Sequence, residues 1–143
     1  MLTIIWMTSR STCDRLLLDT HALYWYTTGV AKLSLQAQAV IQDATNDVFL
    51  SPASLWEMAL KVGNGKWIMN QSFEAFVDLC LNKYEFRILP IQPSHTIAVS
   101  RLPFPTEHRD PFDRMLISQA KAEGLAIVSV DSAFDPYGVT RIW

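Results

Sequence analysis

The chain has 143 residues, half of them hydrophobic and 18% charged, which is the composition of one globular domain and not of a disordered chain. Its formal net charge of −2 gives no general attraction to nucleic acid or to anionic membranes, so any contact with nucleic acid has to be local. No stretch reaches the roughly 18 apolar residues of a membrane span. We expect a cytoplasmic protein with no membrane partner.

The first fifteen residues, MLTIIWMTSRSTCDR, are expected to form an extension whose role the sequence does not indicate. They contain a short apolar run without a preceding basic residue or a small-residue cleavage site, so a secretory signal peptide is not expected. The two cysteines, Cys13 and Cys80, make a weak case for a disulfide. Cys80 falls within the apolar helical pattern FEAFVDLCL, where a small buried side chain fits.

Apolar runs and helix caps predict an alternation of strands and helices along the chain. The strands are expected at 16–18, 48–50, 86–91, 125–130 and, as a last edge strand, 139–143. The helices are expected at 20–29, 35–44, 53–62, from about 72 to beyond 80, at 93–102 and at 110–124. This alternation predicts a single α/β domain with a largely parallel sheet between helices.

Four acidic residues from distant segments fall where they would meet in such a fold. Ligands of an open parallel sheet bind beyond the carboxyl ends of its strands. Two of the acids directly follow an expected strand, and two lie near the start of helices that would begin at the same edge. We therefore expect one rim of the domain to hold Asp19, Glu57, Asp113 and Asp131, with Asp110 close to Asp113.

Each acid also has an ordinary structural explanation. Aspartate at a helix start is commonly a cap or a turn former, which would account for Asp19, Asp110 and Asp131. Asp113 could complement a helix dipole or a cap. Glu57 could form an ion pair with Lys61, four residues later on the same helix.

The joint arrangement favours a metal site. Several carboxylates within a few ångströms repel one another unless a cation lies among them. Oxygen ligands without cysteine favour a hard ion, Mg²⁺ or Mn²⁺. Such an ion activates water and stabilises charge on phosphate oxygens, so the pattern indicates phosphodiester chemistry.

Other residues give weaker patterns. The histidines His21, His95 and His108 contain no pair at the spacing of a zinc-binding helix. No glycine-rich phosphate loop is present. The aromatic run Tyr24, Trp25, Tyr26 is more often part of a core or an interface than a platform for stacking bases.

Three blocks of the sequence carry a resemblance to a known family. They are LLLDTHALYW, then VFLSPASLWEMALKVGNGKW, then HRDPFDRMLISQAKAEGLAIVSVDSAF, followed by YGV. The chain resembles the PIN-domain ribonucleases from about Leu16 to Trp143, and it is most similar to the VapC-like toxins of bacterial type II toxin–antitoxin modules. The resemblance implies a PIN-like three-layer α/β/α sandwich with a central, mostly parallel sheet over residues 16–143, preceded by the extension at 1–15.

The resemblance also implies roles for particular residues. The family's metal-binding acids correspond to Asp19, Glu57, Asp113 and Asp131, which would be both the metal ligands and the catalytic residues. Secondary candidates are Thr20, Asp110 and Ser129, the last standing where the family often has threonine. Lys61, Arg109 and Arg114 are candidates for contact with RNA phosphates, although each would also serve as a surface charge or an ion-pair partner.

The implied function is a Mg²⁺- or Mn²⁺-dependent endoribonuclease that cuts single-stranded or loop RNA with a metal-activated water. The family's members usually form homodimers and are inhibited by a cognate antitoxin protein. Two alternatives stay open: a PIN fold that binds RNA or protein without catalysis, and a PIN nuclease outside any toxin–antitoxin pair.

Overall fold

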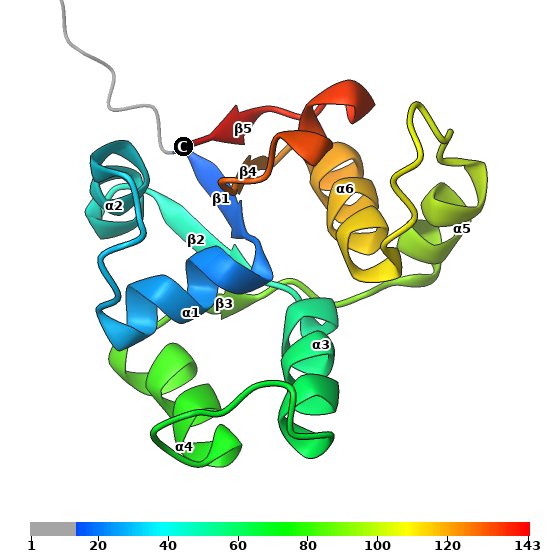
Figure 1. Ribbon diagram of the computed structural model, residues 1–143. Coiled ribbons are helices and arrows are strands. Elements are labelled where there is room, and N and C mark those ends of the chain that lie inside the picture. Colours follow the sequence, from blue (N-terminus) through cyan, green and yellow to red (C-terminus); the bar gives the residue numbers. More distant parts are fainter. Residues whose placement is uncertain (1–13) are drawn as a thin grey trace, which may run out of the picture.

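The computed structural model describes residues 14–143, which form five strands and several helices around one sheet (Figure 1). The strands are β1 (Arg15–Leu18), β2 (Asp47–Leu50), β3 (Arg87–Ile88), β4 (Ala126–Val128) and β5 (Arg141–Ile142). The α-helices are α1 (Thr20–Thr28), α2 (Leu35–Gln42), α3 (Pro52–Gly63), α4 (Phe73–Asp78), α5 (Pro93–Arg101) and α6 (Pro111–Glu123). A π-helical turn, η1 (Leu79–Lys83), continues α4, and a 3₁₀ segment, η2 (Ser132–Tyr137), follows β4.

The sheet has the strand order β3-β2-β1-β4-β5, and every neighbouring pair is parallel. The central strand β1 is buried on both faces because successive side chains of a strand point to opposite sides. Leu16 and Leu18 pack into one core cluster and Leu17 into the other. The expected α/β class with a three-layer arrangement is therefore confirmed.

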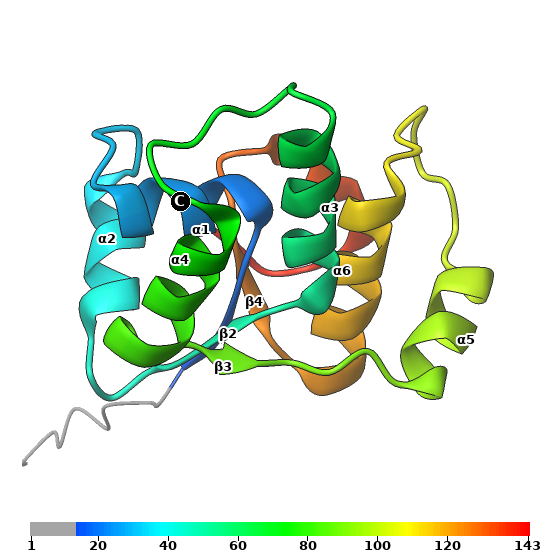
Figure 2. The same cartoon turned by 90° about the horizontal axis from the view of Figure 1, so that it is seen from below.

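The two core clusters correspond to the two helical layers. The first cluster contains buried residues of α1, α2 and α4, and the second contains buried residues of α6 and η2, each together with residues of the strands. Figures 1 and 2 show α1, α2 and α4 on one side of the sheet and α5 and α6 on the other, with α3 near the end where β2 leads into it. Within residues 14–143, no helix is long and apolar enough to cross a membrane.

The directions of the strands place several chain segments at one edge of the sheet. Helix α1 begins directly after β1, α3 after β2 and η2 after β4. Helix α6 leads back into β4, so its first turn lies at the same edge. The carboxyl ends of the central strands and the amino ends of four helical segments thus converge, which is the arrangement expected from the sequence.

Some expected elements differ in length from those observed. The strand expected at 86–91 is only Arg87–Ile88, because one further bond from the Leu89 N–H to the Leu50 carbonyl (2.8 Å) is followed by Pro90, which has no N–H to donate. The strand expected at 125–130 ends at Val128. The helix expected around Cys80 changes to π-helical geometry there, and η2 was not expected.

Cys80 is fully buried and is a free thiol. Burial raises the pKa of this thiol to about 12, so it behaves as the small apolar side chain that the sequence indicated. Cys13 and most of the expected extension lie outside the described residues.

Phe76 tests the first core cluster. Its side chain is completely buried, and its ring centre lies 6.0 Å from that of Tyr24 and 6.4 Å from that of Phe73. We expect Phe76→Ala to lower the free energy of unfolding by about 3–5 kcal/mol, measured by urea denaturation. Phe73→Ala, at a partly buried position on the same helix, is the matched control and should cost clearly less. Equal losses for the two variants would contradict this description of the core.

Candidate functional site

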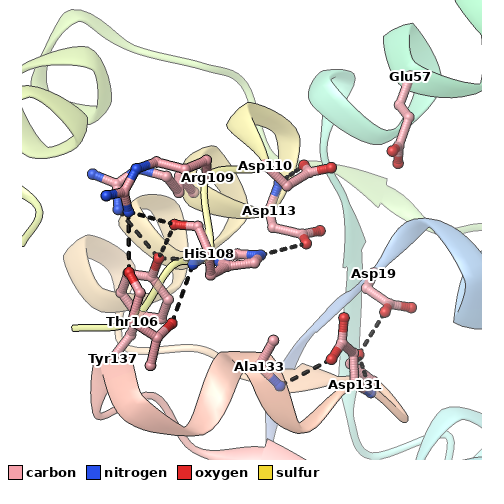
Figure 3. A network of polar contacts seen from close by, with 12 residues as sticks. Asp19, Glu57, Thr106, His108, Arg109, Asp110, Asp113, Asp131, Ala133 and Tyr137 are labelled. Carbon is pink, nitrogen blue, oxygen red and sulfur yellow. Dashed lines mark hydrogen bonds and ion pairs between the residues drawn. The ribbon is translucent and has the colours of Figure 1, made fainter. Parts of the chain in front are cut away.

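A pocket of about 490 Å³ opens at the carboxyl edge of the sheet. All four acids expected to converge line it, together with the secondary candidates Asp110 and Thr20. Figure 3 shows Glu57 approaching this space from α3, Asp113 from α6, Asp19 from the end of β1 and Asp131 from the start of η2. The other lining residues are His21, Trp25, Lys61 and Val130.

Asp19 is the most deeply buried of these acids, with 6% of its surface exposed. One carboxylate oxygen accepts a hydrogen bond from the Ala22 N–H (2.7 Å) and so caps α1. The other accepts one from the Ser129 hydroxyl (2.5 Å). Ser129 in turn accepts a hydrogen bond from the Asp131 N–H (3.0 Å), so this buried hydroxyl fixes two acidic residues from neighbouring strand ends relative to each other.

Asp110 and Asp131 are also helix caps. One oxygen of Asp110 accepts from the Asp113 N–H (2.9 Å) at the start of α6, and one oxygen of Asp131 accepts from the Ala133 N–H (2.9 Å) at the start of η2. The ordinary explanation for these acids is therefore correct, and it does not exclude a second role. A carboxylate that caps a helix through one oxygen keeps its other oxygen available to the pocket.

Asp113 is positioned by a chain of hydrogen bonds that was not expected from the sequence. Its Oδ2 lies 3.0 Å from His108 Nε2, and His108 Nδ1 lies 2.9 Å from the Tyr137 hydroxyl. That hydroxyl accepts a hydrogen bond from Arg114 Nη1 (3.2 Å). Because Tyr137 can donate to Nδ1, the neutral imidazole can carry its proton on Nε2 and donate it to Asp113. His108 thus holds the orientation of the Asp113 carboxylate.

Glu57 lies on α3 with only 7% of its surface exposed. Its Oε2 pairs with Lys61 Nζ at 3.3 Å, one turn further along the helix. The expected ion pair is therefore present, and it lies at the acidic pocket, because both residues line that pocket. Lys61 is the one RNA-contact candidate that reaches the pocket.

Burial and mutual repulsion shape the electrostatics of the pocket. Burial raises the pKa of Asp113 to about 6, against the hydrogen bond from His108, which lowers it, and the charges of Asp110 and Glu57 raise it further. Burial also raises the pKa of Asp19, with a smaller contribution from the charge of Asp131. The pocket therefore holds ionised carboxylates at a free-energy cost that a cation would offset.

The residues present fit a hard metal ion. Within residues 14–143, no three acidic, histidine or cysteine side chains are already arranged as metal ligands. Glu57 is paired with Lys61 and Asp113 with His108. Most of the possible donors in the pocket are nevertheless carboxylates, the ligands that Mg²⁺ and Mn²⁺ prefer, beside the hydroxyl of Thr20 and the imidazole of His21. Thr20 adds a second observation: its buried Oγ1 has no hydrogen-bond partner among the described residues, and such an atom is normally satisfied by water or a ligand.

The other two expected phosphate contacts do not face the pocket. Arg114 is buried, and its guanidinium donates to the carbonyls of Leu102 (2.8 Å) and Pro103 (2.9 Å) and lies over the ring of Phe104. It holds the preceding loop and is not accessible to RNA, which corrects the expectation. Arg109 is exposed but folds back on its own loop, where it donates to the Thr106 carbonyl (3.0 Å), and Figure 3 shows it beyond His108, away from the acids.

The fold and the acidic pocket define an α/β domain whose sheet carries a carboxylate site at its carboxyl edge. The chain belongs to the PIN domain family, which matches residues 16–139. A comparison with curated protein sequences finds no match.

Solved structures show the same fold. The chain is similar to VapBC2 from Rickettsia felis bound to a DNA fragment from its promoter, with a TM-score of 0.65 and 16% identity over 89% of this chain and 96% of that one. FitAcB from Neisseria gonorrhoeae has a TM-score of 0.61 and 17% identity, and the match covers 88% of this chain and 95% of that one. VapC20 from Mycobacterium tuberculosis is described as a toxin that cleaves the sarcin–ricin loop. It has a TM-score of 0.59 and 18% identity, and the match covers 87% of this chain and 96% of that one. The expected VapC-like PIN fold is confirmed.

Asp113 provides a pH test of the pocket in metal-free protein. Its pKa is about 6 in the fold, against 3.8 for an ordinary aspartate, so the folded state binds the proton of Asp113 more tightly than the unfolded state does. The resulting stabilisation is fully present below about pH 4 and is lost as the pH rises through about 6. Asp113→Asn cannot ionise, so it should gain stability relative to the wild type between these limits, by on the order of 2 kcal/mol. Urea denaturation in EDTA at a series of pH values measures the difference.

Asp78→Asn is the matched control for this series, because Asp78 is an exposed carboxylate on α4 outside the pocket. Its stability should follow that of the wild type across the same pH range. A constant difference between Asp113→Asn and the wild type would show that Asp113 titrates as an ordinary surface acid.

Proposed function

We propose that this protein is a Mg²⁺- or Mn²⁺-dependent endoribonuclease that acts on single-stranded or loop RNA in the cytoplasm, as the toxin of a type II toxin–antitoxin module. The observation that carries the proposal is the pocket in which Asp19, Glu57, Asp113 and Asp131 meet beside the unpartnered hydroxyl of Thr20. Membership of the PIN family and the similarity to VapC20, which is described as cleaving the sarcin–ricin loop, support the assignment to RNA.

The metal ligands in this proposal are Asp19, Glu57 and Asp113, with Asp131 as a direct or water-mediated ligand. When bound, the ion supplies Lewis acidity, which lowers the pKa of water and stabilises charge on phosphate oxygens. The protein's own contribution is to hold the carboxylates in place. Ser129 fixes Asp19 through its hydroxyl, and His108 fixes Asp113 through Nε2.

Lys61 has a second part in the proposed reaction. Its ammonium group lies in the pocket against Glu57, where it lowers the repulsion that a phosphodiester meets among four carboxylates. We infer that Lys61 contacts a phosphate of the substrate. Arg114 has no such part, because its guanidinium is occupied by backbone carbonyls.

The proposed partners are a cognate antitoxin and a second copy of the chain. Similar structures named VapBC2 and FitAcB support the antitoxin. Two large apolar side chains on α3, Trp56 and Leu60, are 62% and 48% exposed, and an interface would cover such a surface. Size-exclusion chromatography with light scattering, with and without a co-expressed antitoxin, tests both partners.

RNA cleavage tests the activity directly. Purified protein freed of any antitoxin should cut a short single-stranded RNA in the presence of Mn²⁺, and EDTA should abolish the cut. Asp19→Asn and Glu57→Gln should each lower the rate by more than about 100-fold, because each removes a ligand charge. Asp78→Asn should keep the rate of the wild type. Absence of cleavage by folded wild-type protein with Mn²⁺ would refute the enzyme.

Thermal unfolding with and without Mn²⁺ tests the metal site independently of any substrate. Asp19→Asn keeps an oxygen that can cap α1, but it removes a buried charge, so the metal-free variant should melt at a higher temperature than the metal-free wild type. Saturating Mn²⁺ should stabilise the wild type, by about 4 kcal/mol at a thousand times the dissociation constant, and should have little effect on the variant. Equal metal-induced shifts in both proteins would show that Asp19 is only a helix cap.

A further inference from the structure

We propose that His21, Trp25 and Trp67 form a nucleobase-stacking subsite beside the acidic pocket, which receives a base adjacent to the scissile phosphate of a single-stranded RNA. This inference rests on the proposed function, since it names where that substrate binds. The aromatic cluster and its charges carry the argument, and no metal ion is needed for it.

The aromatic run at 24–26 is divided by the structure into core and pocket residues. Tyr24 packs on Phe76 and Tyr26 packs on Phe86, so both belong to the first core cluster. Trp25 lies on the other side of α1, does not belong to either core cluster and lines the acidic pocket. Its indole contacts the rings of His21 and Trp143 but is only half-buried, so part of its apolar surface stays exposed at the wall of a polar pocket.

His21 extends this aromatic surface. Its ring centre lies 5.5 Å from that of Trp25 at an interplanar angle of 44° and 5.5 Å from that of Trp67 at 19°, so the imidazole is stacked against one indole and tilted against the other. His21 is itself exposed and lines the pocket two residues after Asp19. The exposed imidazole of His21 and the half-buried indole of Trp25 therefore offer ring surface beside the carboxylates, with Trp67 supporting His21 from the first core cluster. Every nucleobase has a flat face that stacks on such rings.

The charges around the cluster favour nucleic acid over a peptide. Lys32 Nζ lies 5.5 Å from the ring centre of Trp25, and Lys61 Nζ lies 5.8 Å from that of Trp67. These two cations would repel an arginine or lysine side chain of a peptide that approached the rings. The same two ammonium groups would attract the phosphates on either side of a stacked base.

The placement also connects the subsite to the reaction. His21, Trp25 and Lys61 line the same pocket as the four acids. A base held on the rings would bring its own phosphate to the carboxylate end of that pocket. The rings would then select for unpaired nucleotides, because a base inside a duplex is already stacked on its neighbours and has no free face.

Binding measurements in EDTA test the subsite without cleavage. Fluorescence anisotropy measures the affinity of a short labelled single-stranded RNA for the wild type, His21→Ala and His21→Phe. Each protein is tested with the unmodified RNA and with a set of RNAs that each lack the base at one position. His21→Ala should weaken binding about 5- to 10-fold, as expected for the loss of one stacked base, and His21→Phe should restore it to within about twofold. One abasic position should weaken binding to the wild type, and its effect should disappear in His21→Ala.

A matched pair of lysine variants serves as the control for charge. Lys32 and Lys83 are both exposed, and each ammonium lies 5.5 Å from an aromatic ring centre. Lys32 lies over Trp25, which lines the acidic pocket, and Lys83 lies over Tyr84, which does not. Lys32→Ala should weaken RNA binding several-fold and reduce its salt dependence, and Lys83→Ala should leave both unchanged. With Mn²⁺ present, His21→Ala should raise KM more than it lowers kcat.

Three results would overturn the subsite. The first is that His21→Ala binds RNA as tightly as the wild type does. The second is that the wild type does not bind RNA in EDTA. The third is that an arginine-rich peptide binds the wild type but not His21→Ala, while both proteins bind RNA equally well. This result would assign the rings to a protein partner. Cleavage of RNA by the wild type with Mn²⁺ would remain a separate result, so failure of the subsite and failure of the nuclease are distinguishable.

Discussion

The direction of the strands is the constraint on which the site depends. All neighbouring strands are parallel, so β1, β2 and β4 end at one edge, and the helices that return the chain begin there. Carboxylates at a helix start are stabilised by the unpaired N–H groups and the positive end of the helix dipole. Acids that are far apart in the sequence therefore meet in one pocket, where the helix starts offset part of the repulsion between their negative charges.

The pocket gains precision from residues that serve the fold and the site together. Ser129 is fully buried, bonds to Asp19 and accepts from the Asp131 backbone, so the register of β4 beside β1 sets the spacing of two acids. On the opposite side, Tyr137 couples the position of Asp113 to η2 through His108. Movement of either strand end would therefore change the distance between carboxylates, which makes the geometry of the site a property of the whole sheet.

Sequence reasoning found the acids because their positions follow from local rules. Asp19 and Asp131 come directly after apolar runs that predict strands, and a cap followed by proline marks the start of the helix that carries Glu57. It missed His108, because its partner Tyr137 is 29 residues away and no fixed spacing relates them. It misassigned Arg114, because charge in a sequence does not reveal that loop carbonyls and an aromatic ring enclose the guanidinium.

The capping role of the aspartates bears on how lost activity would be recognised in proteins built like this one. Asp19 and Asp131 each cap a helical segment, so selection for folding alone would keep a capping side chain, aspartate or asparagine, at both positions after catalysis had disappeared. Glu57 caps nothing and lies inside α3. An inactive descendant of such a domain would lose its glutamate first, and that position is the more informative marker of a working enzyme.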